Sequence, residues 1–161
     1  MIEIMHPHKN IDYTGILDLV KTMRDSDFYF TENNERFYVT DFSTLKRFLR
    51  ACRFIYVKKE KGEYRGLVML WKSTGGGKDR YYLKMCALTP NDARDLMTVL
   101  LWNVSKEIFV KIRKENKILP VIRSKGFRFL GGRGIQVLLS KQPNKEMFTR
   151  KIYYDESRDE Y

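Results

Sequence analysis

The chain has 161 residues, of which 43% are hydrophobic and 14% aromatic, so it is long enough for one packed core and too apolar to be disordered. No apolar run approaches the ~20 residues of a membrane span, and the N-terminus lacks the basic and apolar stretches of a signal peptide. Two cysteines, Cys52 and Cys86, give neither a disulfide framework nor a paired zinc spacing. We expect a reduced, cytoplasmic protein with a single domain over residues 1–151.

The net charge of +11 is unevenly distributed along the chain. Residues 105–151 hold 13 basic and 3 acidic side chains, whereas residues 152–161 hold one basic and four acidic ones. The basic third predicts a positive surface that attracts nucleic acid, an acidic protein or an anionic cofactor. A solvated basic face that serves only solubility is the alternative. The last ten residues are expected to form a flexible acidic tail.

Apolar residues alternate with a period of two in seven short segments, which we predict to be strands. These segments are residues 2–4, 54–57, 67–71, 81–88, 108–113, 127–130 and 135–140. Helical spacing of apolar residues predicts four helices. They cover residues 13–24, 41–52, 90–102 and 118–125. Residues 25–38 are predicted to be a loop, and the glycine-rich residues 131–134 the turn of the last hairpin.

The clearest element boundary is Thr89-Pro90-Asn91-Asp92. The side chain of Thr89 can accept a hydrogen bond from the first helical turn, and Pro90 suits the first helical position. Asp92 adds negative charge at the positive end of the helix dipole. The helix that follows is apolar on most sides, so we expect it to be central and buried.

The predicted order is strand, two helices, three strands, helix, strand, helix and two strands. Together with Ala87-Leu88-Thr89-Pro90, and with Lys125-Gly126-Phe127 after an apolar helix, this order resembles the GNAT superfamily of Gcn5-related N-acetyltransferases. The resemblance spans residues 2–141. It implies an α+β (α/β) fold with a mixed, mostly antiparallel sheet of about six or seven strands, flanked by about four helices.

The resemblance also implies a function. Acetyl-coenzyme A or another acyl-coenzyme A would enter a cleft between strands 81–88 and 108–113 and give its acyl group to an amine. Its pantetheine amides would pair with the strand edge, and its pyrophosphate would lie at the amino end of the helix that starts at Pro90. No metal is implied. The implied cofactor-binding residues are Cys86, Ala87, Leu88, Asn91, Asp92, Ala93, Arg94 and Asn116.

Two positions depart from the family pattern. The family's phosphate loop carries Gln or Arg followed by two glycines, whereas residues 90–96 contain no glycine. The family's general acid is a tyrosine four residues before the glycine of the Gly-Phe pair, and here that position is Ile122, which cannot donate a proton. Tyr82 is the candidate replacement acid, and a backbone amide near residues 86–88 would stabilise the oxyanion.

A second hypothesis keeps the fold without the chemistry: a binding or structural protein similar to small degenerate GNAT-like proteins of bacteriophages, some of them associated with virions. A third is a base-modifying enzyme on the same fold. Nucleic acid or an acidic protein would bind the basic third. The predicted anion-binding residues are Lys111, Arg113, Lys114, Lys117, Arg123, Lys125, Arg128 and Arg133. Free amides at residues 89–95 favour the enzyme, and a self-capped helix favours the binding protein.

Other motifs favour structural interpretations. Gly75-Gly76-Gly77-Lys78 lacks phosphate-loop spacing and is predicted to connect two strands. His6 and His8 have no third ligand at a metal-binding spacing. As a nucleophile Cys86 would need a basic neighbour, for which Lys84 on the same strand face is the candidate, but buried packing is the prediction for this thiol.

Overall fold

The computed structural model describes residues 2–5, 11–22, 29–32, 35–50, 52–73, 79–134 and 136–143. His6, His8, the glycine loop at residues 75–78 and the predicted tail at 152–161 lie outside these residues.

In the described residues the chain forms nine strands and four helices. The strands are β1 (Ile2–Met5), β2 (Tyr29–Glu32), β3 (Glu35–Tyr38), β4 (Cys52–Glu60), β5 (Glu63–Ser73), β6 (Arg80–Ala87), β7 (Ile108–Arg113), β8 (Arg128–Arg133) and β9 (Gln136–Lys141). The helices are α1 (Tyr13–Thr22), α2 (Phe42–Leu49), α3 (Pro90–Asn103) and α4 (Leu119–Ser124).

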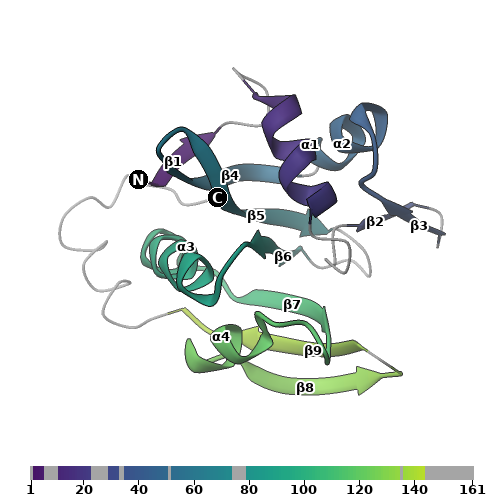
Figure 1. The fold of residues 1–161 in the computed structure, drawn as a ribbon. Coiled ribbons are helices and arrows are strands. Elements are labelled where there is room, and N and C mark those ends of the chain that lie inside the picture. The colour runs from purple at the N-terminus through teal and green to yellow at the C-terminus, as the bar shows by residue number, and fades with distance from the viewer. Residues whose placement is uncertain are drawn as a thin grey trace, which may run out of the picture.

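Seven strands form the central sheet in the order β1-β4-β5-β6-β7-β9-β8, which can be followed from top to bottom in Figure 1. β6 and β7 are parallel, and the other neighbours are antiparallel. β2 and β3 form a separate two-stranded sheet. The predicted α+β class, with a mixed and mostly antiparallel sheet, is confirmed.

Each face of the sheet buries its own core, because successive strand residues point to opposite faces. Leu67 and Met69 of β5 pack with α1 and α2, whereas Val68 and Leu70 pack with α3 and α4. The two helix pairs therefore cover opposite faces. α1 and α2 lie beside the upper strands in Figure 1, and α4 lies beside the lower ones.

Local sequence signals explain where several elements begin. At α2, Thr44 donates its backbone N–H to Oδ1 of Asp41 at 2.8 Å, and Asp41 donates its own to Oγ1 of Thr44 at 3.1 Å. This reciprocal pair is a capping box. Lys61 and Gly62 both have positive φ, 52° and 80°, which suits the two-residue turn between β4 and β5.

Gly66 on β5 allows α3 to lie close to the sheet. A Cβ at Gly66 would lie 2.9 Å from Cδ1 of Leu96 and 3.0 Å from the carbonyl oxygen of Cys86. The missing side chain thus sets the distance between α3 and the strands that it covers.

The predicted loop at residues 25–38 is wrong in part, because β2 and β3 form a hairpin there. The signal was present: β-prone Tyr29-Phe30-Thr31 and Arg36-Phe37-Tyr38 flank Asn33-Asn34, a pair that favours hairpin turns. In each of these strands two aromatic residues are adjacent and the other two residues are polar, so the period of two that marks the other strands is absent.

Three smaller expectations also need correction. Cys52 begins β4 instead of ending α2, although its thiol still lies 3.6 Å from the carbonyl oxygen of Phe48. α3 is buried along one face only, and Trp102 is 54% exposed. Gly131 and Gly132 belong to β8, and the turn includes Gly134 with φ 64°.

Candidate functional site

A notch opens in the sheet between β6 and β7. The two parallel strands pair only through Tyr81 with Ile108 and Tyr82 with Phe109. Beyond these pairs, residues 83–87 and 110–113 have no strand partner on the edges that face each other, within the described residues. The predicted separation of these two strands is therefore observed.

The edge of β6 that faces the notch offers backbone amides. Leu88 donates its N–H to the carbonyl oxygen of Arg65 on β5 at 2.9 Å. Because N–H groups alternate between the two edges of a strand, those of Met85 and Ala87 point to the notch, whereas the N–H of Leu83 takes part in the pairing with Phe109. The amides of Met85 and Ala87 are available to a ligand, whereas that of Leu88 is not.

The notch is nearly filled by its own side chains. Its free volume is about 10 Å³, which is about the space of one water molecule. Ile118 and Ile122, the second of them on α4, are both buried in this lining. The lining residues are Leu83, Lys84, Met85, Val110, Lys111, Ile112, Asn116, Ile118 and Ile122.

The amino end of α3 is capped by its own residues. Oγ1 of Thr89 accepts the N–H of Asp92 at 3.2 Å, the N–H of Ala93 goes to the carbonyl oxygen of Thr89 at 3.1 Å, and Pro90 has no N–H. In the first turn this leaves at most the amide of Asn91 for an outside ligand. The helix end is therefore self-capped, which favours a binding protein over an enzyme that holds a phosphate at this helix.

The carboxylate of Asp92 is also fully engaged. It is 4% exposed and accepts hydrogen bonds from Nζ of Lys58 at 2.8 Å, from Arg65 at 3.1 Å and from Oγ1 of Thr89 at 2.7 Å. Burial opposes ionisation of Asp92, but these hydrogen bonds outweigh it and hold its pKa below the usual value. Lys58 also bonds Asp95 at 2.7 Å.

This arrangement does not fit a pyrophosphate at α3. A buried carboxylate lies in the first turn of this helix and would repel a phosphate there, and it already pairs with the nearby cations Lys58 and Arg65. Arg94, the remaining basic candidate at this end, donates to Oδ1 of Asn91 at 2.8 Å, and Ala93 is packed in the core. Pairing by Lys58 and Arg65 was not predictable from the sequence, because both lie far from α3 along the chain.

Solved structures with a similar fold are known. An N-acetyltransferase from Staphylococcus aureus Mu50 matches with a TM-score of 0.63 and 16% identity, over 88% of this chain and 97% of that one. The protein has the GNAT fold. No protein-family model and no curated protein matches the sequence.

Two other GNAT-fold neighbours were solved with acetyl-coenzyme A. A putative acetyltransferase from Salmonella typhimurium has a TM-score of 0.61 and 13% identity, over 89% of this chain and 95% of that chain. The N-acetyltransferase PseH from Campylobacter jejuni has a TM-score of 0.58 and 12% identity, over 89% and 100%. At these identities the likeness concerns the fold.

Cys86 does not line the notch. Its side chain lies on the opposite side of the sheet from α3, in the core with α1 and α2, and burial raises the pKa of its thiol well above the usual value. Lys84 shares that strand face, as predicted, with Nζ 5.7 Å from the Trp71 ring. The predicted packing role of Cys86 agrees with this placement.

Tyr82 lies at the head of the notch, in the last residue pair that joins β6 to β7. Its ring is 5.8 Å from that of Phe109 and has Nζ of Lys111 at 5.2 Å. A hydroxyl at this position could serve a reaction in the notch. Ile122, at the position of the family's tyrosine, lines the notch but has no proton to give, whereas Tyr82 borders the notch without belonging to its lining.

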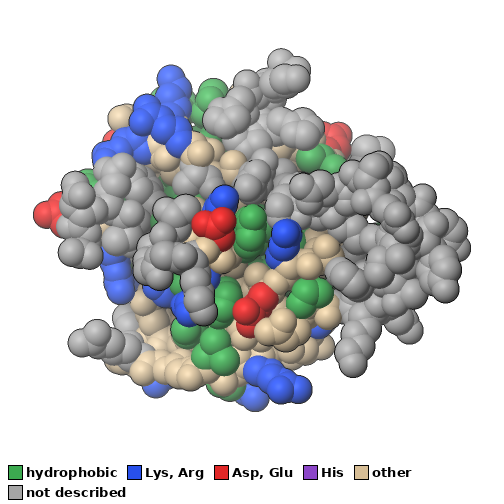
Figure 2. Space-filling view, turned by 180° about the vertical axis from the view of Figure 1, so that it is seen from behind, with side chains coloured by type: hydrophobic (Ala, Val, Ile, Leu, Met, Phe, Trp, Pro, Cys, Tyr) green, Lys and Arg blue, Asp and Glu red, His purple; other side chains and the backbone are tan. Residues whose placement is uncertain are grey.

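The predicted anion-binding residues lie on two surfaces. The first, which we call the cationic face, is the α1–α2 side of β6, β7 and β8, as the register of these strands shows. Its members are Arg80, Lys111, Arg113 and Arg128; Lys84 lies on the same side but is buried, with 4% of its surface exposed. Among the described strand residues of this side in β6 to β8, none is Asp or Glu. Figure 2 shows, from behind, Lys and Arg spread among hydrophobic and a few acidic side chains.

The second surface is a groove beside α4 that includes Lys114, Lys117 and Arg123. Lys125 instead donates to Oγ1 of Thr98 at 2.9 Å and so joins α4 to α3. The side chain of Arg133 lies outside the described part of the structure.

The described part of the chain holds neither a cluster of metal ligands nor a membrane-spanning helix. No group of three or more His, Cys, Asp and Glu side chains is placed to hold a metal ion there. Of the helices described, none has the length and apolarity to cross a membrane.

Proposed function

We propose that this protein transfers an acyl group from a coenzyme A thioester, acetyl-coenzyme A in the simplest case, to an amine acceptor. The observation that carries the proposal is the parting of β6 and β7 beyond Tyr82 and Phe109. The similar fold of two acetyl-coenzyme A complexes supports it.

The backbone and side chains of the notch have separate roles in this proposal. The N–H groups of Met85 and Ala87 would bind the amide carbonyls of the pantetheine arm and the acyl oxygen as it gains negative charge. A bound thioester supplies an activated carbonyl. Tyr82 would donate a proton to the sulfur as the C–N bond to the acceptor forms and the C–S bond breaks, and the proton that the amine nitrogen loses would restore the tyrosine hydroxyl.

The acceptor is expected to carry negative charge near its amine. Lys111 belongs both to the notch lining and to the cationic face, whereas Lys84 of the same lining is buried. An anionic group beside the amine would therefore be attracted to the α1–α2 side of the notch. Because the notch is nearly filled, binding requires Ile118 and Ile122 to move away from β6.

Titration with acetyl-coenzyme A by calorimetry tests the proposal. We expect saturable binding and a higher melting temperature. A free ligand concentration of 100 times the dissociation constant adds about 2.7 kcal/mol to the free energy of unfolding. Ala87→Pro removes one notch amide without breaking the ladder to β5, and it should weaken binding at least tenfold. The unfolding free energy of that variant without ligand controls for misfolding. No binding at millimolar ligand would show that the proposal is wrong.

The self-capped end of α3 and the cationic face favour a second function, binding of a nucleic acid without acyl transfer. Arg80 lies 4.8 Å from the Phe109 ring and Lys111 lies 5.2 Å from the Tyr82 ring. A guanidinium stacked on a ring keeps its N–H edges free for phosphate. Aromatic rings thus hold two cations of the cationic face in place.

Fluorescence anisotropy with a labelled single-stranded oligonucleotide tests this second function. We expect binding that weakens steeply between 50 and 200 mM salt. Lys111→Glu should weaken it at least tenfold, and Lys61→Glu in the β4–β5 turn should not. Equal loss in both variants would indicate unspecific attraction to net charge and would contradict a role for the cationic face.

A further inference from the structure

The groove beside α4 adjoins the notch. It has a volume of about 710 Å³, against about 10 Å³ for the notch. Asn116 lines both, and its Oδ1 accepts the N–H of Ile118 at 3.0 Å, which fixes the chain where the two spaces meet. A ligand that extends out of the notch past Asn116 therefore enters the groove.

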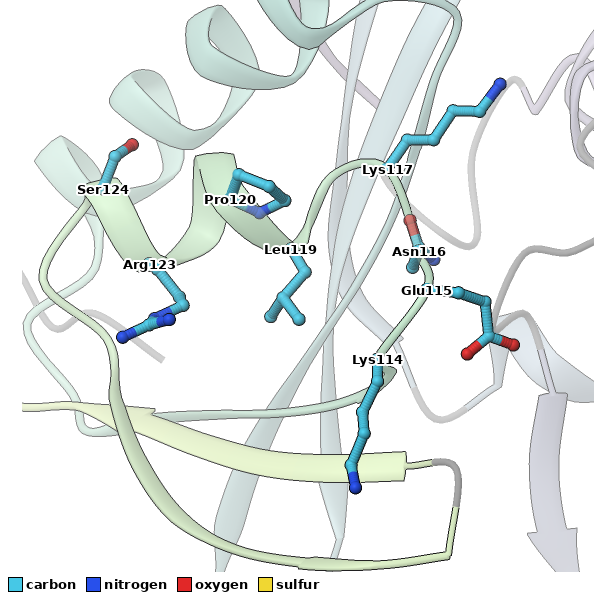
Figure 3. A pocket seen from close by; sticks show the side chains of 8 residues that line it. All are labelled: Lys114, Glu115, Asn116, Lys117, Leu119, Pro120, Arg123 and Ser124. Atoms are coloured by element: carbon cyan, nitrogen blue, oxygen red, sulfur yellow. The ribbon is translucent and has the colours of Figure 1, made fainter.

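The groove is cationic. Its lining has three basic side chains and one acidic one, the residues being Lys114, Glu115, Asn116, Lys117, Leu119, Pro120, Arg123 and Ser124. In Figure 3, Lys114, Leu119 and Arg123 project to the same side of this segment, whereas Glu115 and Lys117 point away. Two cations thus flank an apolar floor, and the carboxylate is turned from it.

Arg123 is held in place by β8. Its guanidinium carbon lies 4.4 Å from the centre of the Phe129 ring. Stacking occupies the flat face of the guanidinium and leaves its N–H edge for hydrogen bonds, the geometry in which arginine binds phosphate. The ring therefore reduces the conformational freedom that Arg123 would otherwise lose when it binds an anion.

We propose that this groove, through Lys114 and Arg123, binds the phosphate groups at the far end of the donor's pantetheine arm. The inference rests on the proposed acyl transfer. It follows from two observations together: the amino end of α3 is occupied by Asp92, and a roomy cationic groove adjoins the notch at Asn116. Free coenzyme A and a phosphopantetheine arm on a carrier protein share this phosphate chemistry.

Three donors of different length test the proposal by calorimetry on the full chain: acetyl-coenzyme A, S-acetyl-4′-phosphopantetheine and S-acetylpantetheine. We expect the two phosphorylated donors to bind at least tenfold more tightly than the third. Lys114→Gln with Arg123→Gln should abolish this difference and leave the affinity for S-acetylpantetheine unchanged, which also shows that the variant is folded. Arg94→Gln at α3 should change no affinity by more than twofold.

The outcomes separate this inference from the function on which it rests. If none of the three donors binds, acyl transfer itself is wrong. If acetyl-coenzyme A binds but only Arg94→Gln weakens it, α3 holds the phosphates and the groove does not. If the wild-type protein binds all three donors with equal affinity, the groove does not bind the phosphate groups. If acetyl-coenzyme A binds tightly and S-acetyl-4′-phosphopantetheine does not, the ligand is free coenzyme A and not a carrier-bound arm.

Discussion

Nζ of Lys58 on β4 lies 2.8 Å from Oδ1 of Asp92 on α3, and the same ammonium lies 2.7 Å from Asp95. The two carboxylates differ in exposure, at 4% for Asp92 and 57% for Asp95. One lysine therefore makes a buried and an exposed ion pair with the same helix. These two ion pairs fasten the amino end of α3 to β4 of the sheet.

Asp92→Asn is expected to lower the free energy of unfolding by about 2–4 kcal/mol, because it leaves Lys58 and Arg65 without a buried counter-charge. Asp95→Asn removes the exposed partner of the same lysine and should cost less than about 1 kcal/mol. Urea denaturation of both variants measures the difference. Equal losses would mean that burial of Asp92 adds nothing to the pair.

The Asp92 contribution should depend on pH with a definite sign. Hydrogen bonds from Lys58, Thr89 and Arg65 outweigh burial and hold the folded-state pKa of Asp92 below its usual 3.8. The ionised carboxylate therefore stabilises the fold above about pH 4, and this contribution is lost as the pH falls further. The difference in unfolding free energy between wild type and Asp92→Asn should be constant near neutral pH and shrink below about pH 4.

The basic partner gives the opposite sign. Hydrogen bonds that Lys58 donates to Asp92 and Asp95 raise its pKa above the usual 10.5, so its contribution is complete below that pH and is lost above it. Urea titrations at a series of pH values measure both limits. Asp12 and Asp41 also have lowered pKa values. Both residues are present in the wild type and in Asp92→Asn, so their effects cancel when the two unfolding free energies are subtracted. If the difference in unfolding free energy between wild type and Asp92→Asn does not change with pH, the ion pair between Lys58 and Asp92 does not contribute to stability.

Gly66→Ala should destabilise the fold by about 1–3 kcal/mol, because the added methyl group meets Leu96 and the backbone of Cys86. Gly131→Ala on β8 is the matched control, since a Cβ there has no atom within 4 Å. Thermal unfolding of the two variants provides the measurement. If both melt alike, close approach of α3 to β5 does not need a glycine.

Neither cysteine should react as a nucleophile in the native protein. Burial raises the pKa of Cys52 to about 12 and that of Cys86 further above its usual value. A thiol-specific reagent at pH 8 should modify the native protein on the order of 100-fold more slowly than the unfolded chain, in which both thiols are free. If one thiol of the folded protein is modified as fast as in the unfolded chain, that cysteine is reactive and the prediction is wrong.

Periodicity and local capping predicted most of the framework. Ile108 to Arg113 alternate in the sequence and form β7 with the predicted bounds, and Thr89 caps α3 as expected. These signals are local, so one sequence is sufficient to detect them. The pattern does not predict β2 and β3, because each is four residues long and pairs two adjacent aromatic residues with two polar ones, without alternation.

The site was less predictable than the fold, because its geometry depends on residues far apart in the chain. The sequence shows Asp92 near the start of a helix, but not that Lys58 and Arg65 reach it across the sheet. It shows a run of basic residues near the C-terminus, but not that Lys111 and Arg123 lie on different surfaces. Strand register and helix packing decide such placements, and a single sequence determines them only through the whole fold.

The scarcity of pairing between β6 and β7 has a consequence for exchange of backbone hydrogens with solvent deuterium. Within the described residues only Tyr81 and Tyr82 of β6 pair with β7, so the later residues of β6 have ladder hydrogen bonds on the β5 side alone. Along β6, the amides of Lys84 and Cys86 face β5 and should exchange slowly, whereas those of Met85 and Ala87 should exchange quickly. A single strand would then display alternating fast and slow sites, and ligands that enter the notch would slow only the fast ones.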